Sequence, residues 1–395
     1  MISGYIKNFS MIFDEPESME EGNGSPIGAV NNRLRLKFSL RPAGPLSFNA
    51  AYDISPRIQD PSLFKESLYI FTMDTSSYRI EDFDTLITPK GDDPDTSFGI
   101  YHNLDRFFFT IQYSVCDIYL GRQAIAWGSG HMINPTDILA PFSFTELDQE
   151  ERYGVDAVRI RIPLGLMNEL DAGYVFGKDF SSREHAFFIR GKGYRWKTDI
   201  ALLFMGFKEH AMVGLDLACA IGGAGVWLEG AYVKPDFFRD SNVSANPGIN
   251  DSSYIRISTG VDGSLSEKLY GYAEYHFNSA GASSPEAYMD LLSTTAYRDG
   301  AVYLMAEHYL ILSGTYQLNP LTPTTVTLLY NIKDNSLTLS PEAEYNISED
   351  IYIAAGATLG IGKRPTGQTS SADPVLRSEF GAYLDMYWAS FRIYF

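Results

Sequence analysis

Apolar and polar residues alternate with a period of two in many short segments of this chain. The segments 32–40, 154–162, 254–262, 268–277 and 337–346 show the pattern plainly. In the first of them, leucine and phenylalanine alternate with arginine, lysine and serine. Successive side chains of a β-strand point to opposite faces, so this period predicts strands with one apolar and one polar face. Because the pattern recurs along the whole chain, it predicts an all-β protein.

The connections between these segments alternate between short and long. Short links such as 163–166 and 221–223 stand between longer ones such as 128–152 and 278–305. Outer-membrane barrels join their strands in this way, with short periplasmic turns and long outer loops. A soluble sandwich has the same alternation within its strands, and the connection lengths favour the barrel. We therefore predict a single domain over 1–395, folded as a closed antiparallel transmembrane β-barrel.

Counting through the alternation predicts eighteen strands, and sixteen to twenty stay open because 67–72 and 78–87 can form an additional hairpin. An even number places both chain ends on the short-turn side, as a single-chain bacterial barrel requires. Loops 56–103 and 128–152 are expected to lie partly inside the lumen. The predicted strands are 2–13, 31–40, 46–55, 104–114, 117–127, 153–162, 167–177, 185–191, 196–207, 211–220, 224–234, 252–263, 268–277, 306–318, 323–331, 336–346, 351–361 and 380–395.

Composition excludes several other classes of protein. The hydrophobic share of 45% argues against disorder. No stretch approaches the roughly 20 apolar residues that a membrane-spanning helix needs. The formal net charge of −18 disfavours binding to a nucleic-acid backbone. The two cysteines, Cys116 and Cys219, provide neither a disulfide framework nor a paired metal motif.

Both ends of the chain bear on its export. Residues at alternate positions near the C-terminus are apolar, namely Tyr387, Ala389, Phe391, Ile393 and Phe395. This series resembles the signal by which barrel-assembly machinery recognises outer-membrane substrates, and the resemblance implies that machinery as a partner. The opening residues, MISGYIKNFS, lack a basic start followed by an apolar core. We therefore expect the numbered chain to be the mature form, with its export signal removed.

The segment 120–142 reads LGRQAIAWGSGHMINPTDILAPF. It resembles the signature of an uncharacterised family of porin-like outer-membrane proteins, in which Gly-Arg-Gln, Trp-Gly-x-Gly and Asn-Pro-Thr-Asp follow one another. More loosely, the strand layout is similar to the alginate-export and substrate-specific porins. The resemblance implies an eighteen-stranded barrel and does not identify a solute.

Physically, this segment is a strand that runs into a turn-rich loop. Glycine permits backbone angles closed to other residues, and a residue before proline favours extended backbone. Asp137 can cap a short following helix. We expect the loop to fold inward and narrow a pore, and a rigid outer turn is the alternative. The constriction-loop residues are Trp127, Gly128, Gly130, Asn134, Pro135 and Asp137.

Arg122 conflicts with this pattern, because it shares a predicted face with the apolar Ile118, Leu120 and Ala124. That face is the apparent lipid side. A β-bulge would re-aim the side chain, and a position close to the membrane interface is the alternative.

The predicted inward face carries charges of both signs, which set selectivity in a barrel lumen. Basic residues gather on the second and sixth strands and acidic ones on the thirteenth to sixteenth, so opposite walls would create a transverse field. The alternative is a salt-bridge lattice that fills the wall. The pore-lining candidates are Arg33, Arg35, Lys37, Arg159, Arg161, Arg256, Glu274, Glu307, Glu342 and Glu344.

No motif for catalysis, a cofactor or a metal stands out. The chain has no Gly-x-Ser-x-Gly, His-Glu-x-x-His or Cys-x-x-Cys-His run. Ser129 and His131 are the closest nucleophile and base, and two residues in a turn rarely form a catalytic dyad. The acidic runs in the long loops do not match a calcium-binding EF-hand. We predict no catalytic residue, no cofactor and no defined metal site.

These features predict a porin-like channel of the bacterial outer membrane for passive passage of a polar or amphipathic solute. A scaffold or sheath is one alternative, with a periplasmic or intraluminal partner as in a lipid-trafficking complex or a porin–cytochrome conduit. An outer-membrane hydrolase is the other. The acids of 128–152, which are Glu146, Asp148, Glu150 and Glu151, are expected to favour cations modestly. The sequence does not determine the solute, the direction of transport or the oligomeric state.

Overall fold

The strands form a single closed antiparallel sheet. The computed structural model describes residues 1–14, 26–42, 44–61, 78–81, 85–88, 97–141, 146–239, 252–366 and 375–395. Its strands are β1 Ile2–Asp14, β2 Ile27–Leu40, β3 Leu46–Gln59, β4 Thr85–Thr88, β5 Phe98–Gln112, β6 Asp117–Ala124, β7 Gly154–Pro163, β8 Glu169–Val175, β9 Ala186–Arg195, β10 Thr198–Phe207, β11 His210–Ile221, β12 Ala224–Lys234, β13 Tyr254–Ser264, β14 Leu269–Asn278, β15 His308–Asn319, β16 Thr322–Asn331, β17 Ser336–Ser348, β18 Ile351–Ile361 and β19 Asp385–Tyr394.

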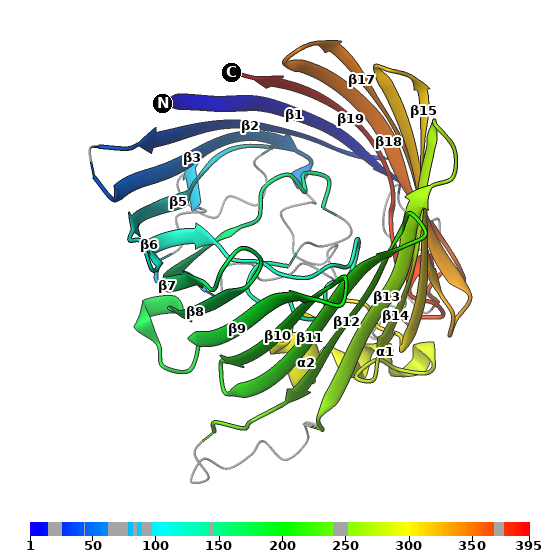
Figure 1. The fold of residues 1–395 in the computed structure, drawn as a ribbon. Coiled ribbons are helices and arrows are strands. Elements are labelled where there is room, and N and C mark those ends of the chain that lie inside the picture. The colour runs from blue at the N-terminus through cyan, green and yellow to red at the C-terminus, as the bar shows by residue number, and fades with distance from the viewer. Residues whose placement is uncertain are drawn as a thin grey trace.

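β1 pairs with both β2 and β19, so the sheet closes into a barrel (Figure 1). β3 pairs directly with β5, and the short β4 lies beside β5 as an extra strand. Each of the eighteen predicted strands corresponds to one strand of this ring. The predicted closed antiparallel barrel is therefore confirmed.

Some strand ends differ from the prediction. β5 begins at Phe98 rather than at 104, and β6 ends at Ala124 rather than at 127. β19 begins at Asp385 rather than at 380, because Phe380–Ala382 forms a 3-10 turn. Of the additional hairpin, 67–72 lies outside the described residues, whereas 85–87 is part of β4.

One end of the barrel carries tight turns. Trp196 and Lys197 join β9 to β10 with φ angles of 53° and 62°, and Gly222 and Gly223 join β11 to β12 with 61° and 90°. Two positive φ angles in succession characterise the two-residue hairpin turn that matches strand twist. The chain ends also meet here, where Gly4 and Phe395 exchange backbone hydrogen bonds of 2.8 and 3.0 Å (Figure 1).

The outer face of the barrel is apolar. In β2, Leu36, Phe38 and Leu40 are 42%, 40% and 49% exposed, whereas Arg35, which directly precedes Leu36, is 0% exposed. The charged residues of the alternation therefore point into the lumen. No helix among the described residues is long and apolar enough to cross a membrane.

The lumen is filled by loops at the end with long connections. Trp127, Ile138 and Leu139 pack against inward apolar side chains of β7 to β13. A second cluster joins Ile133 and Tyr288 of the loops to β15 and β16. The loop after β14 also contains the short helices α1 Tyr288–Leu291 and α2 Thr295–Asp299. The hydrophobic core of this barrel thus lies inside it.

The two faces of one strand provide a test of this arrangement. Val326 of β16 points outward and is 45% exposed, and its neighbour Thr327 points into the lumen. We expect Val326→Lys to destabilise the barrel in lipid vesicles by about 2–4 kcal/mol, the cost of a lipid-facing lysine near the bilayer midplane. Thr327→Lys is the matched control and should cost much less. Urea unfolding, followed by the heat-modifiable mobility of the folded barrel on gels, measures the free energy of unfolding of both variants. An equal loss of stability in the two variants would show that the faces are misassigned.

Candidate functional site

β6 leaves the barrel wall early, and this departure creates the inward loop. β6 pairs with residues 107–112 of β5, whereas β4 pairs with residues 100–102. Among the described residues, the part of β5 between them has no strand partner on that side. Inside β6, Gly121 has a φ of +116°, and a Cβ there would lie 2.3 Å from the carbonyl oxygen of Phe107. Only glycine fits this position.

Arg122 fills the gap. Its guanidinium donates to the carbonyl oxygens of Leu104 at 2.9 Å and Glu81 at 2.6 Å, and it forms a 2.8 Å ion pair with Asp156. β6 keeps a regular register with both neighbours, so no bulge re-aims the side chain. Instead, the segment 78–81 covers it, and Ile80 donates its backbone N–H to Asp156 at 2.8 Å. Arg122 therefore satisfies backbone carbonyl oxygens of Leu104 and Glu81 beside the end of β6.

After Ala124 the chain crosses the lumen to the opposite wall. Ile125 is fully buried, and the Trp127 ring meets the ring of Phe188 edge-on with centroids 4.7 Å apart. Gly128, at a φ of +117°, and Gly130 bring the chain around Asn134 so closely that a Cβ on either would clash with residues 133–134. The turn-rich loop read from the sequence is present, and in this structure it lies inside the barrel.

Two buried glutamates hold this loop by its backbone. Glu274 of β14 accepts N–H bonds from His131 at 2.8 Å and from Ile133 at 3.0 Å. Glu229 of β12 accepts both the N–H and the hydroxyl of Thr136, at 2.8 and 2.7 Å, and the N–H of Ser129 at 3.2 Å. Buried N–H groups need acceptors, and bonds to a carboxylate are stronger than neutral ones. The loop and the two acids therefore depend on one another.

The His131 imidazole contacts two aromatic rings and a carboxylate. It stacks on Tyr272 with centroids 4.6 Å apart and meets Trp227 edge-on at 4.7 Å. Its Nε2 lies 2.9 Å from Asp262 of β13. Ser129 instead donates its hydroxyl to Asp216 at 2.5 Å. The two residues turn to different carboxylates, an arrangement unlike a catalytic dyad.

Asp137 plays a different part from the one predicted. No helix follows it within 138–141; instead its carboxylate binds Arg152 at 2.7 Å. Burial raises the pKa of Asp137 to about 6, although Arg152 opposes the shift. This pair closes the loop on itself where 146–152 turns back towards the wall.

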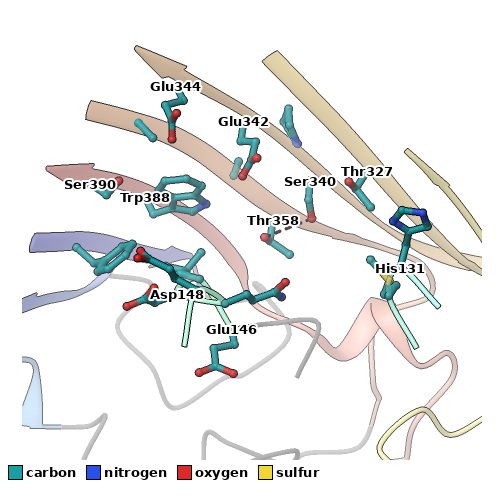
Figure 2. A pocket seen from close by; sticks show the side chains of 18 of the residues that line it. His131, Glu146, Asp148, Thr327, Ser340, Glu342, Glu344, Thr358, Trp388 and Ser390 are labelled. Carbon is teal, nitrogen blue, oxygen red and sulfur yellow. Dashed lines mark hydrogen bonds between the residues drawn. The ribbon is translucent and has the colours of Figure 1, made fainter. Parts of the chain in front are cut away.

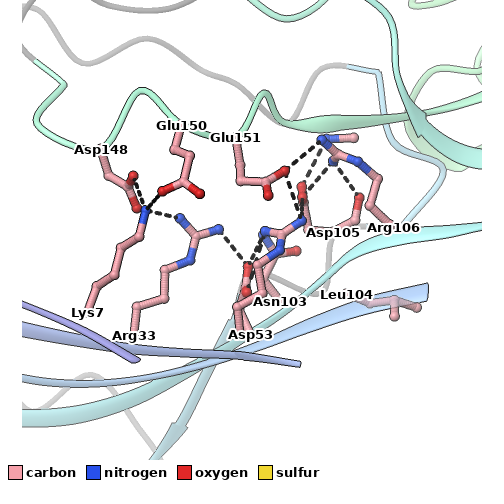
Figure 3. Close-up of polar contacts among 12 residues, drawn as sticks. Lys7, Arg33, Asp53, Asn103, Leu104, Asp105, Arg106, Asp148, Glu150 and Glu151 are labelled. Carbon is pink, nitrogen blue, oxygen red and sulfur yellow. Dashed lines mark hydrogen bonds and ion pairs between the residues drawn. The ribbon is translucent and has the colours of Figure 1, made fainter. Parts of the chain in front are cut away.

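The segment 146–152 is bound to the basic wall of β1 and β2 (Figure 3). Lys7 contacts Asp148 at 2.7 Å and Glu150 at 2.5 Å, and Lys37 pairs with Glu151. Behind this layer the inward acids of β3 and β5 pair with arginines of β2: Asp53 with Arg33 at 2.7 Å and with Arg35 at 3.1 Å, and Asp105 with Arg35 at 2.5 Å. Three of the four loop acids expected to face the pore are therefore ion-paired to the wall.

A polar cavity of about 480 Å³ remains between the loop and the far wall (Figure 2). One side is formed by loop residues such as His131, Glu146 and Asp148, and the other by β16 to β19 and Phe9 of β1. On the wall, Ser313, Thr327, Ser340 and Thr358 form a row of hydroxyls across neighbouring strands. Trp388, Glu342, Glu344 and Arg392 line the next part of the wall.

The predicted pore-lining residues fall into different places. Glu342 and Glu344 line the cavity. Glu274 and Arg256 also point inward but are 0% and 3% exposed, because the loops cover them. Arg159 and Arg161 pair with acids of β8, as the salt-bridge-lattice alternative predicts. Glu307 precedes β15 at the long-loop end of the barrel, where its carboxylate binds Lys333 at 2.6 Å.

Two residues of the site were not predicted from the sequence. Lys7 lies in an ordinary alternating strand, and Trp388 lies between two members of the C-terminal apolar series, on the opposite face of the strand. The alternation of polarity indicates that both side chains point inward, so it could have identified them as lumen residues. It does not indicate which inward side chains the loops leave uncovered.

Another loop attachment lies on the far wall. Glu379 accepts the N–H of Met305 at 2.9 Å and the side-chain amide of Asn331 at 2.8 Å, and the Tyr309 hydroxyl also donates to it. Burial raises the pKa of Glu379 to about 8.

Among the described residues, no three His, Cys, Asp or Glu side chains lie close enough together to form a metal site.

Comparisons with known proteins identify the fold. No family model and no curated protein matches the chain. Among solved structures, OpdK of Pseudomonas aeruginosa with vanillate has a TM-score of 0.55 at 8% identity, covering 100% of this chain and 98% of that one. A BenF-like porin of Pseudomonas fluorescens Pf-5 gives 0.57 at 11%, with 100% and 97% covered. OccD3 (OpdP) of P. aeruginosa gives 0.53 at 9%, with 100% and 91% covered. The chain shares their barrel architecture over its whole length.

The contact between Lys7 and the loop leads to a prediction. Lys7→Gln removes a buried cation from Asp148, which keeps Arg33 at 3.3 Å, and from Glu150, which is 40% exposed, so we expect a cost of about 1.4 kcal/mol rather than that of a fully buried charge. We expect amide hydrogen exchange across 146–152 to speed up on the order of tenfold, since exchange follows the free energy of local opening. Lys192→Gln is the control, because that lysine is half exposed and lies 3.6 Å from Asp199. Unchanged exchange in the Lys7 variant would mean that other contacts hold the segment.

Proposed function

We infer that this chain is an outer-membrane channel for passive passage of a polar or amphipathic solute. The observation that carries the proposal is the polar cavity between the inward loop and β16 to β19, inside a closed barrel with an apolar exterior. A row of hydroxyls, carboxylates and one indole on its wall can replace part of a solute's hydration shell. Passage through such a path requires neither a catalytic residue nor a cofactor.

The alternatives receive less support from the same geometry. A sheath needs a lumen wide enough for a partner, whereas loops of this chain occupy the lumen beside β7 to β15. A hydrolase needs a nucleophile joined to a base, whereas Ser129 and His131 bind separate carboxylates. The motif in 120–142 supports the porin-like family to which it bears a resemblance, and that membership remains a prediction.

The solute preference follows from the charges. The solved OpdK structure holds vanillate. The cavity of this chain is lined by acids such as Glu146, Glu342 and Glu344, and its basic residues Arg152 and Arg392 are ion-paired to Asp137 and Glu344. An acidic path repels carboxylates and attracts cations. We therefore expect neutral or cationic solutes.

Planar-bilayer recording tests the channel. The purified protein should give discrete current steps in potassium chloride. Thr327→Trp should lower the conductance severalfold, because an indole would fill part of the cavity that Thr327 lines. Val326→Trp is the matched control and should conduct normally, since this side chain points outward. No current, or an equal effect of both substitutions, would contradict passage along this wall.

The C-terminal strand is proposed to serve assembly. Phe395 is exposed at the short-turn end and bonds Gly4 through its backbone only. We expect deletion of Phe395 to reduce the amount of heat-modifiable barrel in the outer membrane, while the barrels that do form conduct as wild type does. Quantitative immunoblotting of membrane fractions checks the first part and bilayer recording the second. Normal assembly of the deletion variant would contradict the proposal that the barrel-assembly machinery recognises Phe395.

A further inference from the structure

The cavity wall contains an aromatic face beside a carboxylate that forms no ion pair with the described residues. Glu342 of β17, Gly356 of β18 and Trp388 of β19 are register partners across neighbouring strands. A Cβ on Gly356 would lie 2.7 Å from the Trp388 ring. The indole therefore lies over the glycine, on the strand between its own and that of Glu342.

Glu342 differs from the other acids around it. It forms no hydrogen bond or ion pair with the described residues, and it is exposed to the cavity. Arg392 attracts Glu342 electrostatically, but its guanidinium is ion-paired with Glu344. On the loop side, Asp148 pairs with Lys7 and Arg33, and Glu150 pairs with Lys7. Figure 2 shows Trp388 between Glu342 and Glu344 of the wall and Asp148 and Glu146 of the loop.

The chain itself fills an equivalent arrangement elsewhere in the lumen. Trp227 lies over Gly260 as Trp388 lies over Gly356. There the His131 imidazole rests against the indole, and Glu274, the register partner of Gly260 on the next strand, accepts the backbone N–H of His131 at 2.8 Å. A nitrogen-bearing group of the protein thus occupies one site made of an indole, a glycine and a carboxylate. At Trp388 the corresponding space is part of the open cavity.

We propose that Trp388 and Glu342 form a binding site for an organic cation without a carboxylate, such as a quaternary ammonium compound. The indole face attracts the cation through its quadrupole, and the carboxylate of Glu342 supplies the opposite charge. Among the described residues that line the cavity, both arginines are already ion-paired, Arg152 with Asp137 and Arg392 with Glu344, so neither is open to a carboxylate on the solute. This inference rests on the proposed channel function and names its solute class.

The test uses choline as the probe and the full-length protein in planar bilayers. Choline should reduce the potassium chloride current in a concentration-dependent way. Its neutral isostere 3,3-dimethylbutan-1-ol should have little effect, and glycine betaine, which carries a carboxylate, should block more weakly than choline. Glu342→Gln and Trp388→Leu should each raise the half-blocking concentration about tenfold, corresponding to about 1.4 kcal/mol.

Two further variants separate recognition from structure. Trp388→Phe keeps an aromatic face and should retain most of the block, even if the leucine variant folds poorly. Glu349→Gln removes a carboxylate at the exposed short-turn end, and choline should block this variant as it blocks the wild type. Equal block by choline and its isostere, or an unchanged half-blocking concentration in the Glu342 variant, would overturn the site while leaving a conducting channel intact.

A second measurement keeps the two proposals distinguishable. Calorimetric titration of choline into the protein in detergent micelles reports the site without requiring conduction. Binding that Glu342→Gln weakens supports the site even if no current is seen, in which case the channel function alone has failed. Absence of heat with wild-type protein, together with normal conductance, would leave the channel and remove the site.

Discussion

The backbone N–H groups of residues 129–136 need acceptors, because the loop that carries them lies inside the barrel wall. Glu229 and Glu274 provide these acceptors, and each bonds more than one N–H group of the loop. The acids in turn are buried and would be costly without donors. Loop and wall thus satisfy each other. The position of the cavity, the placement of His131 and the return path of 146–152 all follow from this attachment.

The return path depends on charge. Lys7 and the arginines of β2 stand on the inner wall with more positive charge than Asp53 and Asp105 balance locally, and the acids of 146–152 supply the remainder. Acidic residues that looked like free pore charges therefore bind the loop to the wall. What remains for a solute is the opposite wall, where small hydroxyls, an indole and Glu342 are left uncovered.

Much of the fold was predictable, because successive residues of a barrel strand face lipid and lumen in turn and therefore alternate in polarity along the sequence. Residues 32–40 alternate in polarity, and in the structure Leu36 and Phe38 face outward while Arg35 faces inward. The short links allowed the ring to be counted, as at 221–223, where Gly222 and Gly223 form a tight turn. The departure of β6 was harder to place. Arg122 signalled it by standing on an apolar face, but its partners, Glu81 and Asp156, come from distant segments.

The sequence alone determined the strands, their faces and the end of the barrel on which the chain termini lie, because period two and link length are local properties. Only the tertiary structure decided which inward residues meet water. Glu274 and Glu342 are both inward acids on alternating strands, yet one is sealed under the loop and the other is exposed to the cavity. The difference depends on where residues 125–152 cross the lumen. That course is set by contacts between residues more than a hundred positions apart, such as His131 with Glu274 and Lys7 with Asp148.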